Sequence, residues 1–179
     1  EIIGNEFLCD LSEVHLNQLD PYDEEGQKRA FHAGALNVAS LLHHQFLDPI
    51  QQQSRELDPI VAVGCTGGFD FFVNLFGVDW LEWWNNNRRL DWSSSTWTGD
   101  TYQGIYFHVQ EETILSTWKS WVREFITEYC KKHNLKVPNR YTTIKPSGTQ
   151  SLLTKATSGW GPPKGIRYIR RITVGKDDP

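Results

Sequence analysis

The sequence predicts an α/β fold, because short extended runs are followed by glycine-containing turns and then by helical patterns. Two stretches carry this prediction. An apolar run at residues 60–63 leads through a glycine-rich loop at 64–68 into an apolar helix. A β-branched run at 142–144 stops at Pro146 and resumes as a helical stretch over 149–156, which Gly159 ends. This succession of strand, loop and helix is typical of an α/β protein.

Composition limits the class of protein. With 179 residues, 39% hydrophobic and 22% charged, the chain is sized for one globular domain or a large piece of a bigger one. Its net charge of -4 argues against a general polyanion binder, so we expect no nucleic-acid partner. We also expect no membrane span and no signal peptide, because a long apolar run and a basic-then-apolar start are absent from the sequence. The expected location is therefore cytoplasmic.

The first half of the chain predicts one long helix. Residues 7–20 begin as a short apolar segment and continue as a polar loop, with Asp20 placed to cap the helix after it. That helix is predicted over 24–47, where apolar residues recur close to a 3.6-residue period at Phe31, Ala35, Val38, Leu41, Leu42 and Phe46. His43 and His44 are adjacent, so they point in different directions and we expect no metal-binding pair.

A tryptophan-rich segment and a second long helix come next. Residues 79–104 hold five tryptophans among Asn, Ser, Thr and Arg, which indicates a lid, an insertion or a contact surface. A helix is predicted over 110–133, with acidic residues first and basic residues last, as the helix dipole prefers. Cys130 lies among apolar residues of this helix, and we expect it to fill the core.

The three cysteines do not predict a metal centre. Cys9, Cys65 and Cys130 are far apart and form no Cys-x-x-Cys pair, which argues against a zinc ribbon, an iron–sulfur site or a disulfide scaffold. At least one cysteine is therefore unpaired within this chain.

The turn at 146–149 has two interpretations. It lies at a predicted helix N-terminus, where free N–H groups and the helix dipole favour an anion such as phosphate. Gly148 would let a ligand approach the backbone, and Ser147 and Thr149 add hydroxyl donors. Alternatively, one of these hydroxyls merely caps the helix. The turn is not a Walker A loop, because Lys145 precedes it and no second glycine is correctly spaced.

Several motifs in order resemble one enzyme family. They are "EIIGNEFLCDLSEVHLNQLDP" at 1–21, "PNR" followed by "TTIKPSGTQSLL" at 142–153, and "GWGPPKGIRYIRRITVGKDDP" at 159–179. Together they resemble the C-terminal half of the catalytic barrel of adenosylcobalamin-dependent ribonucleotide reductases, especially the ribonucleoside-triphosphate reductases. The resemblance implies that residues 1–179 are a partial catalytic domain, contributing later strands and helices of a ten-stranded α/β barrel. This sequence departs from the family pattern at 61–70, where Gly64 and Cys65 stand in place of the Ser-rich loop expected from family members.

The resemblance also implies roles for single residues. Glu1 corresponds to the last residue of the signature Asn-Pro-Cys-Gly-Glu, the carboxylate that takes the proton of the substrate 3′-hydroxyl. The radical cysteine of that signature precedes this chain. Cys9 resembles a reducing cysteine on the next strand, whose disulfide partner belongs to an early strand that the chain also lacks. The turn resembles the loop that grips substrate phosphates, through Pro146, Ser147, Gly148, Thr149 and Gln150.

The function implied by the resemblance is reduction of ribonucleotides, in the first place triphosphates, to 2′-deoxyribonucleotides for DNA synthesis. The implied cofactor is adenosylcobalamin, which initiates a thiyl-radical mechanism. The implied partners are the ribonucleotide, an external dithiol such as thioredoxin, and the missing N-terminal half of the barrel. Two alternatives stay open: the large subunit of an oxygen-dependent ribonucleotide reductase, and a module that binds nucleotide phosphates without chemistry.

Overall fold

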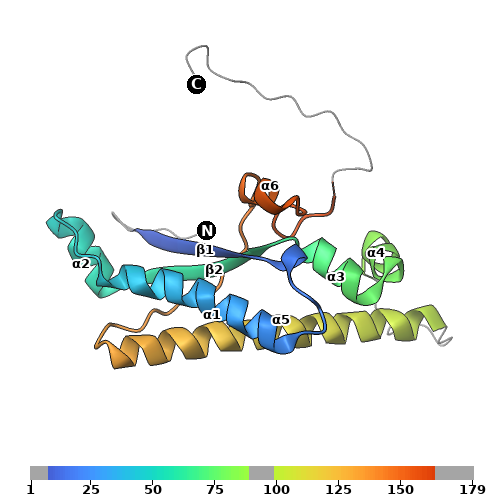
Figure 1. The fold of residues 1–179 in the computed structure, drawn as a ribbon, viewed down its shortest axis with the longest axis horizontal. Coiled ribbons are helices and arrows are strands. Elements are labelled where there is room, and N and C mark those ends of the chain that lie inside the picture. Colours follow the sequence, from blue (N-terminus) through green and yellow to red (C-terminus); the bar gives the residue numbers. More distant parts are fainter. Residues whose placement is uncertain (1–7, 89–98, 164–179) are drawn as a thin grey trace, which may run out of the picture.

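A parallel sheet lies at the centre of the fold (Figure 1). The computed structural model describes residues 8–88 and 99–163. Strand β1 (Cys9–His15) pairs in parallel with β2 (Ile60–Thr66), from Cys9 opposite Ile60 to His15 opposite Thr66. On the other edge of β2, Val63 N donates to Tyr141 O at 2.8 Å and Thr143 N donates to Val63 O at 3.2 Å. Residues 141–143 therefore extend the sheet in the same direction.

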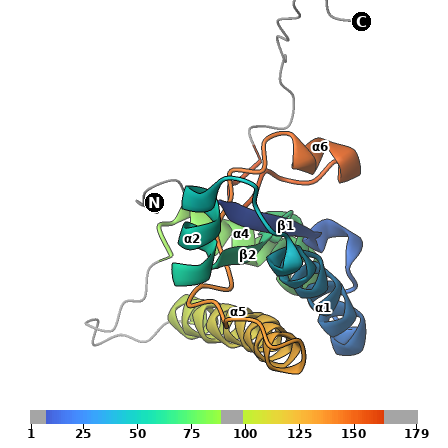
Figure 2. The same cartoon turned by 90° about the vertical axis from the view of Figure 1, so that its left-hand side faces the viewer.

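Helices cover the two faces of this sheet unequally. In chain order they are α1 (Glu24–Ser40), α2 (Pro49–Leu57), α3 (Gly68–Phe76), α4 (Val78–Asn85), α5 (Gly99–Lys132) and α6 (Gln150–Thr154). Figure 2 shows α1 and α5 side by side beneath the sheet and α6 above it. The core between sheet, α1 and α5 includes Val61, Val63, Phe31, Trp118 and Val122, and the rings of Phe31 and Trp118 stack at 4.9 Å.

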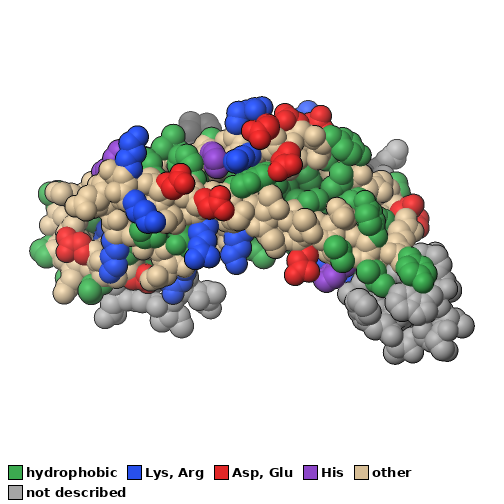
Figure 3. Space-filling view, turned by 90° about the horizontal axis from the view of Figure 1, so that it is seen from below, with side chains coloured by type: hydrophobic (Ala, Val, Ile, Leu, Met, Phe, Trp, Pro, Cys, Tyr) green, Lys and Arg blue, Asp and Glu red, His purple; other side chains and the backbone are tan. Residues whose placement is uncertain are grey.

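The coarse fold class is confirmed: the chain mixes helices with a small parallel sheet. Between them, the described ranges 8–88 and 99–163 hold the β1–β2 sheet and the bridge at Thr142, but not a ten-stranded barrel. No helix in the described residues is both long and apolar enough to cross a membrane. The outer side of α5 carries charged residues, and Figure 3 shows Lys, Arg, Asp and Glu side chains spread over this side of the molecule. These charges keep that side of the fold solvated.

Several element boundaries differ from the sequence predictions. Residues 9–15, expected as an apolar start and a polar loop, form β1, because their backbone pairs with β2. Helix α1 ends at Ser40 instead of 47 and continues only as the short 3-10 helix Leu41–His43. Asp23, and not Asp20, caps α1, with Oδ1 accepting from Gly26 N at 2.9 Å.

The strand β2 continues through the predicted glycine-rich loop as far as Thr66. The loop is thereby reduced to Gly67, which adopts a left-handed conformation (φ 77°) immediately before α3. Helix α5 begins at Gly99, eleven residues earlier than predicted. Cys130 on α5 is fully buried in the core, as expected.

The described part of the tryptophan-rich segment is packed inward. Trp80 is fully buried between Phe69 and Phe72, and its ring centroid lies 5.1 Å and 5.4 Å from theirs. Trp83 is also buried. These side chains therefore build an aromatic core over α5, and the interpretation of the whole segment 79–104 as a lid, an insertion or a contact surface stays a prediction. Residues 89–98 of the segment lie outside the described residues.

Candidate functional site

The two faces of the sheet carry different chemistry. Alternate residues of a strand point to opposite faces, and residues opposite each other in a parallel pair share a face. Ser12 and Val14 face α1, and Ser12 Oγ donates to Gly34 O at 2.9 Å. Cys9, Glu13 and His15 therefore lie on the opposite face, with Gly64 and Thr66 of β2. We call this the α6 face.

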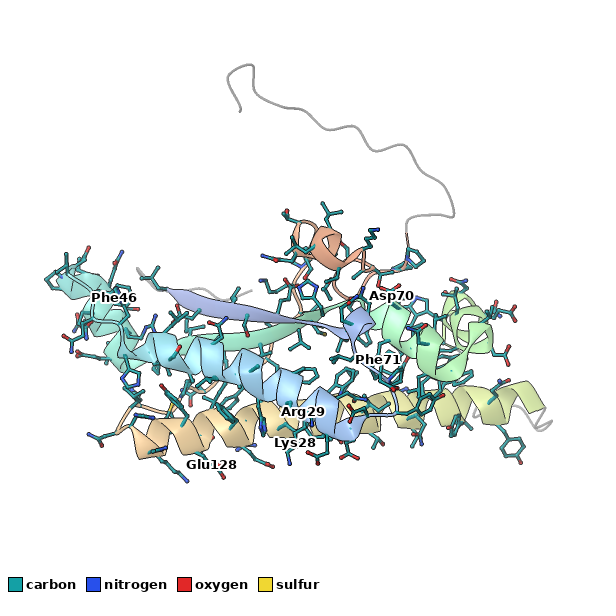
Figure 4. All side chains as sticks on the ribbon, in the orientation of Figure 1. Lys28, Arg29, Phe46, Asp70, Phe71 and Glu128 are labelled. Atoms are coloured by element: carbon teal, nitrogen blue, oxygen red, sulfur yellow. The ribbon has the colours of Figure 1, made fainter. Side chains whose placement is uncertain are left out.

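The segment around α6 is held over the α6 face by polar contacts. His15 Nδ1 lies 2.7 Å from Thr154 Oγ1, and Thr66 Oγ1 donates to Thr157 O at 3.0 Å. Asp70, in the first turn of α3, accepts from both N and Oγ1 of Thr157 at 2.7 and 3.0 Å. Figure 4 shows Asp70 on α3 below this segment. The contacts of Thr154 and Thr157 therefore fix the segment that follows the turn onto the sheet.

The turn at 146–150 is exposed except at one residue. Ser147 is buried in a left-handed conformation (φ 51°), and its Oγ donates to Lys145 O at 3.3 Å. Its carbonyl accepts from Ser151 N at 3.0 Å. Gly148, Thr149 and Gln150 are exposed, and a Cβ on Gly148 would meet no atom within 4 Å. The Ser147 hydroxyl is therefore used inside the turn, while the backbone beside it is open to a ligand.

Neither hydroxyl caps α6 through its side chain. Thr149 occupies the N-cap position without a side-chain hydrogen bond. Helix α6 spans only Gln150–Thr154, shorter than the predicted 149–156, because Lys155 takes a left-handed conformation and ends it before Gly159. The interpretation of the turn as a simple side-chain cap has no hydrogen bond to support it at Thr149.

A buried carboxylate and a lysine lie between the turn and Cys9. Glu13 Oε2 is 3.7 Å from Lys145 Nζ, and the Glu13 side chain is 5% exposed. Cys9 lies on the same face of β1, four residues before Glu13, which is about 13 Å along the strand. Lys145 immediately precedes Pro146. The cysteine, the ion pair and the turn thus follow one another along a single sheet face.

The cysteines differ in their electrostatic surroundings. Burial and then Asp10 raise the pKa of Cys9, whereas the positive charges of Arg55 and Lys145 lower it. Burial and the Glu13 carboxylate raise the pKa of Cys65 to about 12. Burial alone raises the pKa of Cys130. Cys9 and Cys65 are both half-buried, whereas Cys130 is buried, so Cys9 is more exposed than Cys130. Cys9 differs from Cys65 in having nearby cations that lower its pKa.

The other predicted site residue, Glu1, lies outside the described residues, as do residues 164–179 of the last motif. The structure brings Cys9 and the turn onto one face but does not place Glu1. Sequence reasoning missed Glu13 as a site residue. The signal that could have found it is the two-residue period of a strand, which places residues 9 and 13 on the same face.

The pockets found among the described residues lie away from Cys9 and from the turn. Three pockets of about 260, 390 and 430 Å³ lie beside α2, along the free edge of β1 and on the outer side of α5. None of these three is lined by Cys9 or by the turn. Among the residues that the structure describes, His, Cys, Asp and Glu form no group of three that could hold a metal ion.

Comparison of the chain with protein-family models, with curated proteins and with solved structures finds no match.

Proposed function

We propose that this chain is part of the catalytic barrel of a ribonucleotide reductase, located in the cytoplasm. In this proposal the turn at 146–150 binds the phosphates of a ribonucleotide, and Cys9 supplies one of two reducing thiols. The observation that carries it is the arrangement on the α6 face, where Cys9 and the turn share one side of a parallel sheet with the Lys145 cation between them. Cys9 lies in the motif at 1–21 and the turn lies in the motif at 142–153, and both of these motifs resemble the family.

Phosphate binding at the turn has a physical basis in three features. The backbone of Gly148 and Thr149 is exposed at the start of α6. Gly148 has open space around it, so a phosphate can approach the backbone closely. Lys145 adds a positive charge at the entrance of the turn, and a charge-assisted hydrogen bond to phosphate is stronger than a neutral one. These features favour a phosphate group as the ligand, and the resemblance implies that it belongs to a ribonucleotide, in the first place a triphosphate.

The reductive step needs two thiols. One ribonucleotide and two thiols yield one 2′-deoxyribonucleotide, one disulfide and one water, so the 2′-oxygen leaves with two protons while two sulfurs are oxidised. Cys9 provides one thiol, and the second belongs to the part of the barrel that precedes this chain. An external dithiol of the thioredoxin type then reduces the disulfide by exchange. Adenosylcobalamin is the proposed initiator, as the resemblance implies, and the thiol steps described here involve only this chain's Cys9, the second thiol and the substrate.

Cysteine substitution in an enzyme containing this chain and the preceding half of the barrel tests the proposal. Cys9→Ser should abolish turnover with an external dithiol, whereas Cys65→Ser should retain it. After a single turnover without reductant, alkylation followed by peptide mass spectrometry should find Cys9 protected and Cys65 and Cys130 free. Oxidation of Cys65 or Cys130 with Cys9 left free would refute the assignment.

A non-catalytic phosphate-binding module is the second candidate. This candidate needs no second thiol, and Cys65 cannot supply one to Cys9, because Cys65 lies opposite Val14 at the other end of the β1–β2 register and on the other face of the sheet. These two cysteines cannot form a disulfide without moving. Nucleotide binding without oxidation of Cys9 in the same single-turnover experiment would select this candidate.

A further inference from the structure

Glu13 carries a buried carboxylate without a hydrogen-bond donor. Both carboxylate oxygens are inaccessible, and nothing in the described part of the chain donates to either of them. A buried ionised carboxylate is costly unless donors or an opposite charge compensate it. The compensating charge is the Lys145 ammonium, at 3.7 Å from Oε2, which is beyond the range of a normal hydrogen bond. Glu13 is therefore balanced in charge but retains its full capacity to accept hydrogen bonds.

Lys145 covers this carboxylate from the α6 face. Its aliphatic chain crosses Gly64, where an added Cβ would lie 3.3 Å from Lys145 Cδ and 3.4 Å from Cγ. Gly64 is the residue of β2 directly opposite Glu13. The glycine therefore leaves the space through which the lysine reaches the carboxylate. Lys145 itself remains 25% exposed and has room to reorient.

The same lysine borders the phosphate-binding turn of the proposed function. An ammonium on a flexible four-carbon stem is a mobile point charge, and it can exchange one anion for another without a change in the backbone. If Lys145 turns toward a phosphate held at Gly148 and Thr149, it leaves Glu13 uncovered. The carboxylate then needs hydrogen-bond donors, and the nearest source is the group attached to that phosphate.

We infer that Glu13 is a sugar-binding residue, whose carboxylate accepts hydrogen bonds from the ribose hydroxyls once the substrate phosphates have drawn Lys145 away. The inference rests on the proposed function and adds to it the residue that recognises the sugar. Its position supports this role: Glu13 lies between the turn and Cys9 on one face, where the sugar of a nucleotide anchored by its phosphates would lie. In this inference Glu13 binds the substrate directly, and its role is distinct from that of Glu1.

The test compares a ribonucleoside triphosphate with the 2′,3′-dideoxy analogue of the same base, using calorimetric titration of the enzyme that contains this chain and the preceding half of the barrel. The wild type should bind the ribonucleotide more tightly, and Glu13→Gln should reduce this preference by about 10-fold or more, the range expected for hydrogen bonds to a charged acceptor. Affinity for the dideoxy analogue should stay the same or rise, because Glu13 no longer competes for Lys145. Lys145→Gln should weaken both ligands alike.

Glu128→Gln is the matched control, because it makes the same chemical change on the exposed side of α5, where Figure 4 shows Glu128 pointing away from the sheet. It should leave both affinities unchanged. If Glu13→Gln does not fold, the double variant Glu13→Gln/Lys145→Gln leaves no unpaired charge and should also lose the preference. A preference retained in whichever of these variants folds would overturn the inference while leaving nucleotide binding intact. Failure of the wild type to bind either nucleotide would overturn the proposed function, and the inference with it.

Discussion

Substitutions at two glycines near the turn should distinguish an effect on nucleotide binding from an effect on folding stability. A Cβ on Gly148 would meet no atom within 4 Å, whereas a Cβ on Gly159 would lie 2.2 Å from Lys145 O, and Gly159 has a left-handed backbone (φ 53°). Gly148→Val should therefore leave the melting temperature nearly unchanged but weaken nucleotide binding, since a side chain would stand where the phosphate approaches. Gly159→Ala should lower the free energy of unfolding by about 2 kcal/mol or more.

Thermal unfolding and nucleotide titration of both variants provide the measurement. Ser147→Ala is the intermediate case: its hydroxyl is used inside the turn, so we expect a moderate loss of affinity that acts through the shape of the turn. Equal nucleotide affinity of the wild type and Gly148→Val would argue against phosphate binding at this turn.

At the scale of elements, one buried carboxylate joins α4 to α5. Glu111 of α5 accepts from Trp80 Nε1 at 2.6 Å and pairs with Arg88, whose guanidinium lies 5.1 and 4.7 Å from the rings of Trp83 and Trp84. Glu111→Ala should destabilise the fold by about 3 kcal/mol, because it leaves the Trp80 N–H buried without an acceptor. Glu111→Gln should cost less, since its amide oxygen can still accept that hydrogen bond.

This carboxylate also predicts a pH dependence. Burial raises the pKa of Glu111, although Arg88 and Trp80 partly lower it. The folded protein therefore holds this proton more tightly than the unfolded chain does, and the resulting stability is lost as the pH rises through the folded value. Chemical denaturation should show the wild type losing stability relative to Glu111→Gln as the pH rises above about 4. The exposed neighbour provides the control: Glu112→Gln should show the ordinary pH profile of the wild type.

Sequence patterns predicted those elements whose signal is local. The apolar run at 60–63 and the periodic residues of 24–40 became β2 and α1, because burial of these side chains agrees with their own propensity. Residues 9–15 were not recognised as a strand from their pattern, since their extended form depends on pairing with β2. The burial of Trp80 likewise depends on Phe69, Phe72 and Glu111, which lie on other helices.

The same distinction applies to the candidate site. Cys9 and the turn at 146–150 could be singled out from the sequence because each stands in a recognisable motif. Glu13 was missed: a strand period could place it on the face of Cys9, but no local pattern places it beside Lys145, which the pairing of 141–143 with β2 brings to it. The exposure of Gly148 and the inward Ser147 hydroxyl also follow from backbone conformation, which no residue type in the turn dictates.

At the scale of the whole molecule, the sheet has an exposed side that favours association. In the described ranges β1 pairs only with β2, so its other edge keeps unpaired backbone groups, and Leu8 and Leu11 beside it are each 41% exposed. An unprotected edge strand with apolar side chains tends to pair with another chain. Leu11→Lys should therefore reduce self-association of the isolated 179-residue chain, measured by sedimentation velocity.

Leu153→Lys provides the control, because Leu153 is 77% exposed on α6 and belongs to neither strand of the sheet. It should change the association state little. An isolated chain that is monomeric, folds cooperatively and reduces ribonucleotides by itself would contradict both this expectation and the proposal of a barrel fragment.

The pairing of β2 with both of its neighbours also decides when this sheet can form. Strand β1 reaches β2 only after α1 and α2 have been closed into a loop, and residues 141–143 reach the other edge only after α3, α4 and α5 have been closed into a second one. Both pairings are distant in sequence, and such contacts slow folding because the entropy of loop closure is lost before the contacts stabilise anything. During synthesis, Lys145 emerges well after both strands that it bridges. The α6 face therefore acquires its ion pair late, and until then the Glu13 carboxylate is unpaired and open to water.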